Sequence, residues 1–151
     1  MTNENKKHRA GFVNIIGNPN VGKSTLMNAL VGEKLSIVTA KAQTTRHRIM
    51  GIVNGEDYQI VYSDTPGILK PNYRLQKSMM NFVDTAIGDA DIILYVTDTV
   101  EKGDKNDEYI AKLQKINCPV ILVINKIDIS SQEQVLELMN WWKEQIPNAI
   151  I

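Results

Sequence analysis

The chain alternates between short apolar runs and stretches in which apolar residues recur at helical spacing. Continuous apolar runs of strand length predict buried strands at Phe12–Ile16, Ile92–Val96 and Val120–Ile124. Two further strand-like runs, Arg48–Val53 and Tyr58–Tyr62, flank the polar segment Asn54–Asp57, which is typical of a hairpin loop.

Helices are predicted at 23–31, 75–87 and 104–116, where apolar positions recur every three or four residues. Gly32 stands at the capping position of the first helix. A last helix begins after Ser130 or Ser131 and runs to about Gln145, with a capping-box residue three positions after the serine. Met79-Met80 and both tryptophans are interpreted as core packing.

Strands that alternate with helices, and that are apolar almost throughout, predict an α/β fold. We expect a mostly parallel, twisted sheet with one antiparallel edge strand and helices on both faces. Residues 10–151 form one domain in this interpretation, and residues 1–9 form a solvated tail. The tail residues Lys6, Lys7 and Arg9 are the alternative candidates for touching RNA.

Composition adds few constraints on partners. The 17 basic and 17 acidic residues give a formal net charge of zero, which disfavours DNA or a nucleic acid bound by charge alone. The single cysteine, Cys118, is predicted to be a buried core thiol in a reducing cytoplasm. No apolar run approaches the roughly 18 residues of a membrane span, and the N-terminus has no signal-peptide core.

The segment from Gly17 to Thr25 fits the phosphate-loop pattern G-x-x-x-x-G-K-[ST], between a predicted strand and a predicted helix. The glycines allow the backbone to wrap a polyphosphate, Lys23 adds charge for the β- and γ-phosphates, and the Ser24 hydroxyl suits Mg²⁺. A chance match on a glycine-rich turn is disfavoured by this context. The predicted nucleotide-binding residues here are Gly17, Asn18, Pro19, Asn20, Val21, Gly22, Lys23, Ser24 and Thr25.

Two more motifs follow predicted strands. Asp64-Thr65-Pro66-Gly67 lets a carboxylate reach the water shell of Mg²⁺ while a glycine N–H meets a γ-phosphate oxygen. Asn125-Lys126-Ile127-Asp128 suits guanine, because the Asp128 carboxylate can accept from the N1–H and 2-amino group, which adenine does not offer. The Lys126 stem can lie on the base plane, and the Asn125 amide can tie this loop to the phosphate loop. Since carboxyl ends of parallel strands share an edge, all three motifs are expected to converge.

The motifs in this order and spacing resemble those of GTPases of the translation-factor class. Gly17–Leu30 together with Asp64–Gly67 is typical of the bacterial ribosome- and tRNA-associated branch of this class. The segment Ala42–Ile52 resembles the Era-type bacterial GTPases, and the resemblance covers nearly all of residues 10–147. The resemblance implies a P-loop NTPase fold and Mg²⁺-dependent hydrolysis of GTP to GDP and phosphate. It also implies a bacterial, cytoplasmic protein of small-ribosomal-subunit assembly and 16S rRNA maturation, and leaves peripheral association with the inner membrane open.

The resemblance also implies site residues. Thr45 is the switch threonine, with Thr44 the alternative, and the metal set is Ser24, Thr45 and Asp64, the last through water. Arg46, His47 and Arg48 are either an RNA-facing patch or a cluster that protects an edge strand. The predicted catalytic residues are Lys23, Thr45, Gly67 and Asn20.

Ile68 stands where Ras-like enzymes have a water-orienting glutamine, so intrinsic hydrolysis is expected to be slow. In related GTPases with a hydrophobic residue here, K⁺ lies against the phosphates beside an asparagine at the position of Asn20. We therefore expect Asn20 and K⁺ to supply the positive charge that an arginine finger supplies elsewhere. The alternative is a guanine-nucleotide-binding module without significant turnover. A P-loop ATPase is disfavoured by Asp128.

Members of the resembled family carry a fifth motif, a Ser-Ala pair that contacts guanine, and a C-terminal KH domain that binds rRNA. Ala149-Ile150-Ile151 is predicted to begin the strand that leads to this motif. We therefore expect residues 10–151 to be a GTPase domain that is incomplete at its C-terminal end.

Overall fold

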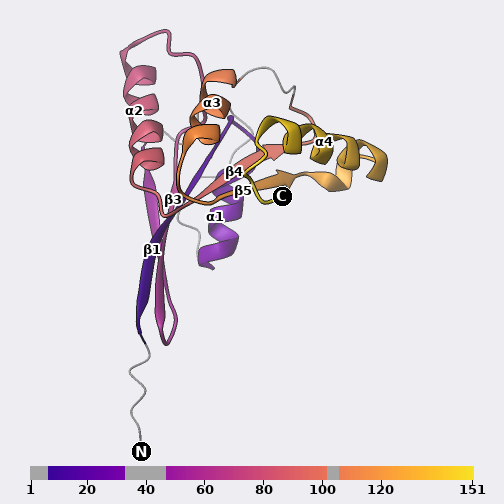
Figure 1. Ribbon diagram of the computed structural model, residues 1–151. Helices are drawn as coiled ribbons and strands as arrows, with labels where there is room; N and C mark the ends of the chain where they lie inside the picture. The colour runs from indigo at the N-terminus through magenta and orange to yellow at the C-terminus, as the bar shows by residue number, and fades with distance from the viewer. Residues whose placement is uncertain (1–6, 33–46, 102–105) are drawn as a thin grey trace, which may run out of the picture.

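The computed structural model describes residues 7–32, 47–101 and 106–151. Among these residues, five strands form one sheet in the order β2-β3-β1-β4-β5 (Figure 1). The strands are β1 (Arg9–Gly17), β2 (Ile49–Asn54), β3 (Tyr58–Asp64), β4 (Ile92–Asp98) and β5 (Val120–Asn125). The helices are α1 (Lys23–Val31), α2 (Arg74–Gly88), α3 (Asp107–Lys115) and α4 (Gln132–Gln145), and η1 (Ile127–Ile129) is a short 3₁₀ helix.

The central strand β1 pairs in parallel with β3 and with β4, and β4 pairs in parallel with β5. Only β2 is antiparallel among the described strands, and it lies at the edge beside β3. The predicted α/β fold with one antiparallel edge strand is therefore confirmed. β1 begins earlier than predicted, because Arg9 already pairs with Tyr58 and donates its N–H to the Asp57 carbonyl at 2.9 Å.

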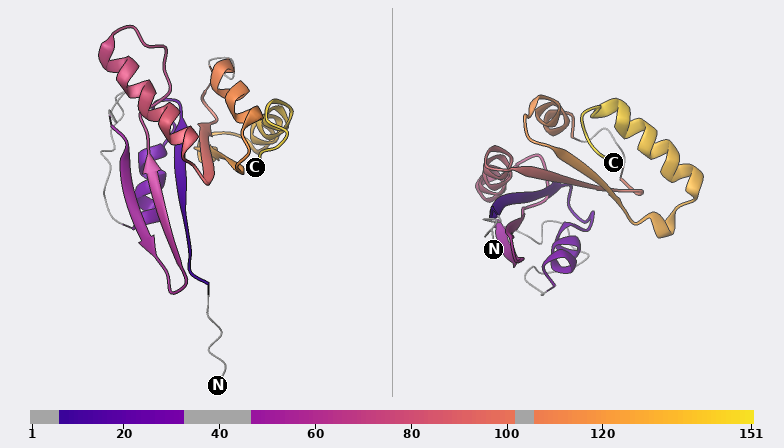
Figure 2. Two further views of the ribbon diagram at one scale, coloured as in Figure 1. Left: turned by 60° about the vertical axis from the view of Figure 1, so that its left-hand side comes forward. Right: turned by 60° about the horizontal axis from the view of Figure 1, so that its bottom comes forward.

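Helices cover both faces of the sheet, as Figure 2 shows in its right-hand view. On one face α1 places Met27 against Ile15, Leu94 and Val96 of the sheet. On the other face α2, α3 and α4 enclose a larger core, to which Met79, Met80, Tyr109, Ile110, Leu113 and Trp142 contribute. The predicted core roles of Met79-Met80 and Trp142 are confirmed, and β4 is buried almost throughout. The hairpin end of the sheet is more open, with Met50, Ile52 and Tyr58 exposed.

The ends of two helices follow the predicted capping chemistry. α1 stops at Gly32, whose φ of 81° is left-handed and whose N–H donates to the Asn28 carbonyl at 2.9 Å. α4 starts with a capping box, in which Ser131 and Gln134 exchange hydrogen bonds of 3.2 and 3.0 Å. Ser131, rather than Ser130, is therefore the N-cap.

The last residues pair with the sheet as predicted. The Ile150 N–H donates to the Val120 carbonyl at 2.9 Å, and the Leu122 N–H donates to the Ile150 carbonyl at 2.7 Å. This parallel bridge places Ile150 beside β5 on the outer side of the sheet. Cys118 is half-buried rather than fully buried, and this burial raises the pKa of its thiol.

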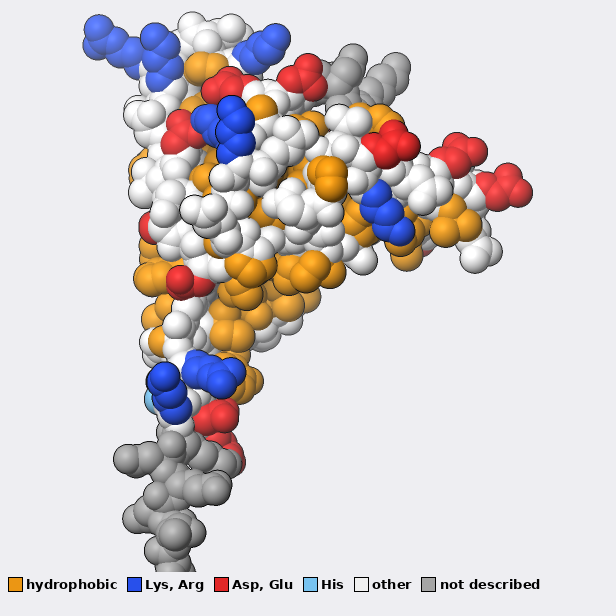
Figure 3. Space-filling view, viewed as in Figure 1, with side chains coloured by type: hydrophobic (Ala, Val, Ile, Leu, Met, Phe, Trp, Pro, Cys, Tyr) orange, Lys and Arg blue, Asp and Glu red, His pale blue; other side chains and the backbone are white. Residues whose placement is uncertain are grey.

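Charged side chains of both signs are interspersed over the face shown in Figure 3, in keeping with the formal net charge of zero. Within the described ranges, no helix combines the length and the hydrophobicity that crossing a bilayer requires.

Candidate nucleotide-binding site

The phosphate-loop segment connects β1 to α1 at the carboxyl edge of the sheet. Asn20 and Gly22 have φ values of 63° and 100°, so the chain turns sharply before the helix begins at Lys23. A Cβ atom on Gly22 would collide with the Asn125 side-chain amide, which lies directly against the loop. The motif therefore requires glycine at 22 for conformation and for space.

Lys23 is buried, with 6% of its surface exposed, and its Nζ donates to the Asn18 carbonyl at 2.6 Å. Burial lowers the pKa of the Lys23 ammonium from its ordinary value of 10.5 to about 8, against the attraction of the Asp64 and Glu101 carboxylates. A cation held in such a dry position lacks water to solvate it, so an anionic ligand would relieve its unfavourable burial. This chemistry fits a polyphosphate.

Ser24 and Asp64 are brought together from α1 and the end of β3. The Ser24 Oγ donates to the Asp64 Oδ2 at 2.5 Å, and Asp64 is fully buried. Thr65 anchors the following turn by donating its hydroxyl to the Ile15 carbonyl at 2.8 Å. A hydroxyl and a carboxylate side by side are hard oxygen ligands, which fit Mg²⁺. Thr44, Thr45 and Arg46 lie outside the described residues.

The Asp64–Gly67 turn packs directly on the phosphate loop. A Cβ atom on Gly67 would collide with Pro19, and the Ile68 N–H donates to the Gly17 carbonyl at 2.9 Å. Ile68 itself is buried at 6% exposure and belongs to the core cluster under α2 and α3. Its side chain packs in the core and also lines the cleft beside the phosphate loop, where it offers no polar group to a water.

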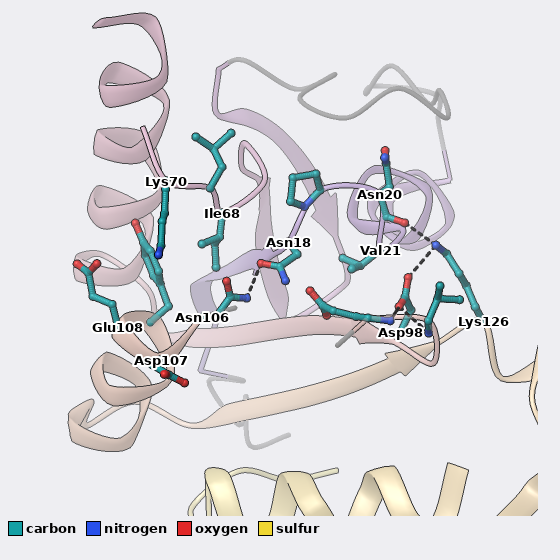
Figure 4. Close-up of a pocket in the computed structure, with 15 residues that line it drawn as sticks. Asn18, Asn20, Val21, Ile68, Lys70, Asp98, Asn106, Asp107, Glu108 and Lys126 are labelled. Carbon is teal, nitrogen blue, oxygen red and sulfur yellow. Dashed lines mark hydrogen bonds and ion pairs between the residues drawn. The ribbon is translucent and has the colours of Figure 1, made fainter. Parts of the chain in front are cut away.

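The base-reading motif reaches the phosphate loop through two side chains. The Asn125 Nδ2 donates to the Val21 carbonyl at 2.9 Å, as predicted for this amide. The Lys126 Nζ donates to the Asn20 carbonyl at 2.6 Å and pairs with the Asp98 carboxylate at 2.8 Å. Figure 4 shows Lys126 reaching across to these partners. Asp128 is exposed in η1.

The predicted convergence of the three motifs is therefore confirmed by contacts between them. A cleft of about 980 Å³ opens beside the loop, between residues 68–70, the end of β4 and the start of α3 (Figure 4). Its lining includes Asn18, Asn20 and Lys126 from the predicted site.

Sequence reasoning missed two polar groups in this cleft. Asp98 is buried at the end of β4, where it holds Lys126 and accepts from the N–H groups of Val100 and Glu101. Asn106 is buried at the start of α3 and contacts the phosphate loop. The position of Asp98 at the carboxyl end of a parallel strand was the available signal for it. No motif marked Asn106.

Arg48 is not available to an RNA-facing patch, which was one of the two interpretations of Arg46, His47 and Arg48. Its side chain is 8% exposed and donates bidentately to the Asp89 carboxylate, at 2.6 and 2.8 Å, and to the Ser63 hydroxyl at 2.8 Å. These hydrogen bonds hold the pKa of the Asp89 carboxyl below its usual range. The guanidinium is thus already occupied, because it joins the start of β2 to the end of α2. The neighbouring His47 ring lies edge-on to Phe82, 5.7 Å away.

A family model described as "50S ribosome-binding GTPase" matches residues 12–126. The chain belongs to this GTPase family. Among its curated relatives in the family, the GTPase Era of Clostridium botulinum (strain Eklund 17B / Type B) is 47% identical over 150 residues. That alignment covers 95% of this chain and 51% of the relative. The chain thus spans about half the length of the curated relatives it matches.

Solved structures of the GTPase family agree with the fold. An Era structure in complex with MgGDPNP and nucleotides 1506–1542 of 16S ribosomal RNA superposes with a TM-score of 0.85 at 39% identity, covering 95% of this chain and 50% of that one. An Aquifex aeolicus Era variant bound to GDP.AlF4⁻ gives 0.83 at 41% identity, covering 93% and 50%. NFeoB from S. thermophilus bound to GDP.AlF4⁻ and K⁺ gives 0.62 at 27% identity, covering 86% and 47%.

Proposed function

We propose that this chain is the catalytic domain of a GTP-hydrolysing switch of the Era type. The observation that carries the proposal is the direct bonding of the Asn125-Lys126 pair to the Val21 and Asn20 carbonyls, which joins a guanine-reading motif to a phosphate loop. The reaction is attack of water on the γ-phosphorus of GTP, with cleavage of the bond to the β–γ bridging oxygen, giving GDP and phosphate.

Nucleotide binding is assigned to residues 17–25, 64–67 and 125–128 in this proposal. Asp128 reads guanine by accepting from its N1–H and 2-amino group, and its exposed position leaves the carboxylate accessible to a base. The Lys126 stem supports the base plane while its ammonium is held by Asp98 and Asn20. Lys23 binds the β- and γ-phosphates and stabilises the charge that develops between them.

Ser24 and Asp64 would hold Mg²⁺, with Thr45 completing the set, and Asp64 would act through a metal-bound water. The ion, when bound, would neutralise phosphate charge. The closeness of the Ser24 hydroxyl and the Asp64 carboxylate, 2.5 Å, supports this assignment. In this proposal the Gly67 N–H would meet the γ-phosphate, and Thr45, which lies outside the described residues, would orient the attacking water.

Hydrolysis is slow without further help, because Ile68 is buried in the core and offers no polar group to the water. We propose that Asn20 helps to hold K⁺ against the phosphates. Asn20 lies in the cleft at the phosphate loop, and the similar NFeoB domain has been solved with GDP.AlF4⁻ and K⁺.

Single-turnover hydrolysis in matched K⁺ and Na⁺ buffers tests this part of the proposal. We expect faster hydrolysis in K⁺ and loss of the difference in Asn20→Ala. Equal hydrolysis rates in both buffers would contradict the K⁺ hypothesis. No measurable turnover in either buffer, with GDP still bound, would favour the alternative that the burial of Ile68 suggests: a binding module without significant turnover.

The proposed cellular role is based on sequence similarity to the Era relatives. We propose that the protein acts in the bacterial cytoplasm in small-subunit assembly and 16S rRNA maturation. An Era structure holds nucleotides 1506–1542 of 16S ribosomal RNA, which supports rRNA as a partner. We propose that a KH domain, of the kind the resembled family carries, would bind this rRNA. Sedimentation with 30S subunits, with GDP or a non-hydrolysable GTP analogue, tests this role and would separate it from peripheral attachment to the inner membrane.

A further inference from the structure

We propose that Asn106 is a positioning residue for the phosphate loop: it fixes Asn18, and through Asn18 it fixes the Lys23 ammonium against the nucleotide phosphates. This inference rests on the proposed guanine-nucleotide function. It assigns a role to a residue at the start of α3 that belongs to none of the three motifs.

The contacts of Asn106 form a buried polar chain. Its Nδ2 donates to the Asn18 Oδ1 and to the Tyr95 hydroxyl, the latter at 2.9 Å. Asn106, Asn18 and Tyr95 are 7%, 8% and 0% exposed, so water cannot easily replace these bonds. Figure 4 shows the two amides pointing at each other from α3 and from the phosphate loop.

Asn106 is also the N-cap residue of α3, yet its side chain makes no capping hydrogen bond with the described part of that helix. An asparagine at this position usually accepts from a backbone N–H in the first turn. The amide is instead directed at the phosphate loop. Removing the Asn106 amide should therefore change the conformation of the phosphate loop more than the stability of α3.

Asn18 links this contact to the functional ammonium. The Asn18 side chain accepts from Asn106, while its backbone carbonyl accepts from the Lys23 Nζ at 2.6 Å. Without the amide of Asn106, Asn18 loses the side-chain bond that restrains its rotation. The carbonyl that aims Lys23 would then shift with it, and small misplacements of such groups are costly.

The consequence depends on the number of phosphates in the ligand. Lys23 addresses the β- and γ-phosphates, whereas the base is read from β5 and η1, where the Asn125 and Lys126 contacts do not involve Asn106. Weakening Lys23 should lower the affinity for GDP and leave that for GMP unchanged. The ratio Kd(GMP)/Kd(GDP) is therefore the diagnostic quantity.

The experiment measures both dissociation constants by competition with a fluorescent GDP in Mg²⁺ buffer. It uses wild type, Asn106→Ala, Asn18→Ala and the double variant. We expect the ratio to fall about tenfold in each single variant, which is about 1.4 kcal/mol, and to fall no further in the double variant. Asn106→Ser is the second variant if Asn106→Ala does not fold, because serine is a good N-cap but its side chain is one bond shorter.

Two controls separate positioning from folding. Tyr95→Phe removes the other partner but keeps the bond between Asn106 and Asn18, so its ratio should stay within about twofold of wild type. Asn14→Ala removes a fully buried amide that donates to the Ala86 carbonyl at 2.6 Å and to Asp89 at 2.7 Å. It should lower the melting temperature and leave the ratio unchanged.

Equal weakening of GDP and GMP in the Asn106 variants would overturn the inference, and so would additive losses in the double variant. Either result would mean that Asn106 acts on the fold or on the base pocket. A wild-type chain that binds GDP no better than GMP would instead overturn the proposed function, and this inference with it.

Discussion

Replacing Lys23 by methionine should make the ligand-free domain more stable while it strongly weakens the binding of GDP. The ammonium is 6% exposed, and burial lowers its pKa from 10.5 to about 8. At 1.36 kcal/mol per pKa unit, keeping this group charged at neutral pH costs the folded state roughly 3 kcal/mol. Methionine has a similar shape without the charge.

The gain is reduced by one lost hydrogen bond. Lys23 donates to the Asn18 carbonyl at 2.6 Å, and such a bond contributes about 1 to 2 kcal/mol. Lys23→Met should therefore stabilise the ligand-free chain by about 1 to 2 kcal/mol, or raise its melting temperature by roughly 2 to 8 °C. At the same concentration, GDP should stabilise wild type by mass action and should stabilise Lys23→Met much less.

The pH dependence supplies a second test. Between about pH 8 and 10.5 the unfolded chain keeps the Lys23 proton while the folded chain releases it, so the unfolded state binds more protons. The contribution of Lys23 to the free energy of unfolding of the wild type therefore rises as the pH rises through that window. The advantage of Lys23→Met should shrink toward pH 10.5.

Urea melts of wild type and Lys23→Met at pH 7 and pH 9.5, with and without GDP, measure all of these quantities. Lys112→Met is the control: its side chain is 38% exposed and pairs with Asp84 at 3.0 Å, so its loss should change stability by less than about 1 kcal/mol. A Lys23→Met chain less stable than wild type at pH 7 without ligand, or a pH-independent gap, would refute the reasoning.

Three other predictions concern single side chains. Asp128→Asn should weaken the binding of GDP and strengthen that of xanthosine diphosphate, whose 2-oxo group accepts a hydrogen bond from the new amide. Competition binding with both nucleotides measures this, and an unchanged affinity for GDP would count against the role of Asp128. Asn125→Ala should weaken GDP binding by about tenfold, because it removes the hydrogen bond from the Asn125 amide to the Val21 carbonyl. The melting temperature should change little. Ser131→Ala should lower the free energy of unfolding by about 1 kcal/mol through the lost capping box, with GDP affinity unaltered, and a weaker affinity would show that α4 influences the site.

Much of the fold followed from local signals in the sequence. The bounds of α1 and the start of α4 depend on Gly32 and Ser131, whose capping chemistry acts within a few residues. The convergence of the motifs followed from a general property of parallel sheets, and the contacts of Asn125 and Lys126 confirm it.

What could not be predicted depends on tertiary contacts. Arg48 looked like a surface cation, but the sequence gives no sign that Asp89, 41 positions away, lies opposite it. Asn106 is 88 positions from Asn18, and it falls inside the helix predicted over 104–116, with no sign of this contact in the sequence. β1 extends to Arg9 because β3 continues beside it, a pairing that the polarity of Arg9 concealed.

The most direct test of the account is a titration of fluorescent GDP and fluorescent ADP against this 151-residue chain in Mg²⁺ buffer. The account predicts tight binding of GDP and no binding of ADP, because Asp128 pairs with guanine alone. Equal affinity for the two nucleotides, or binding of neither by a chain that circular dichroism shows to be folded, would contradict it.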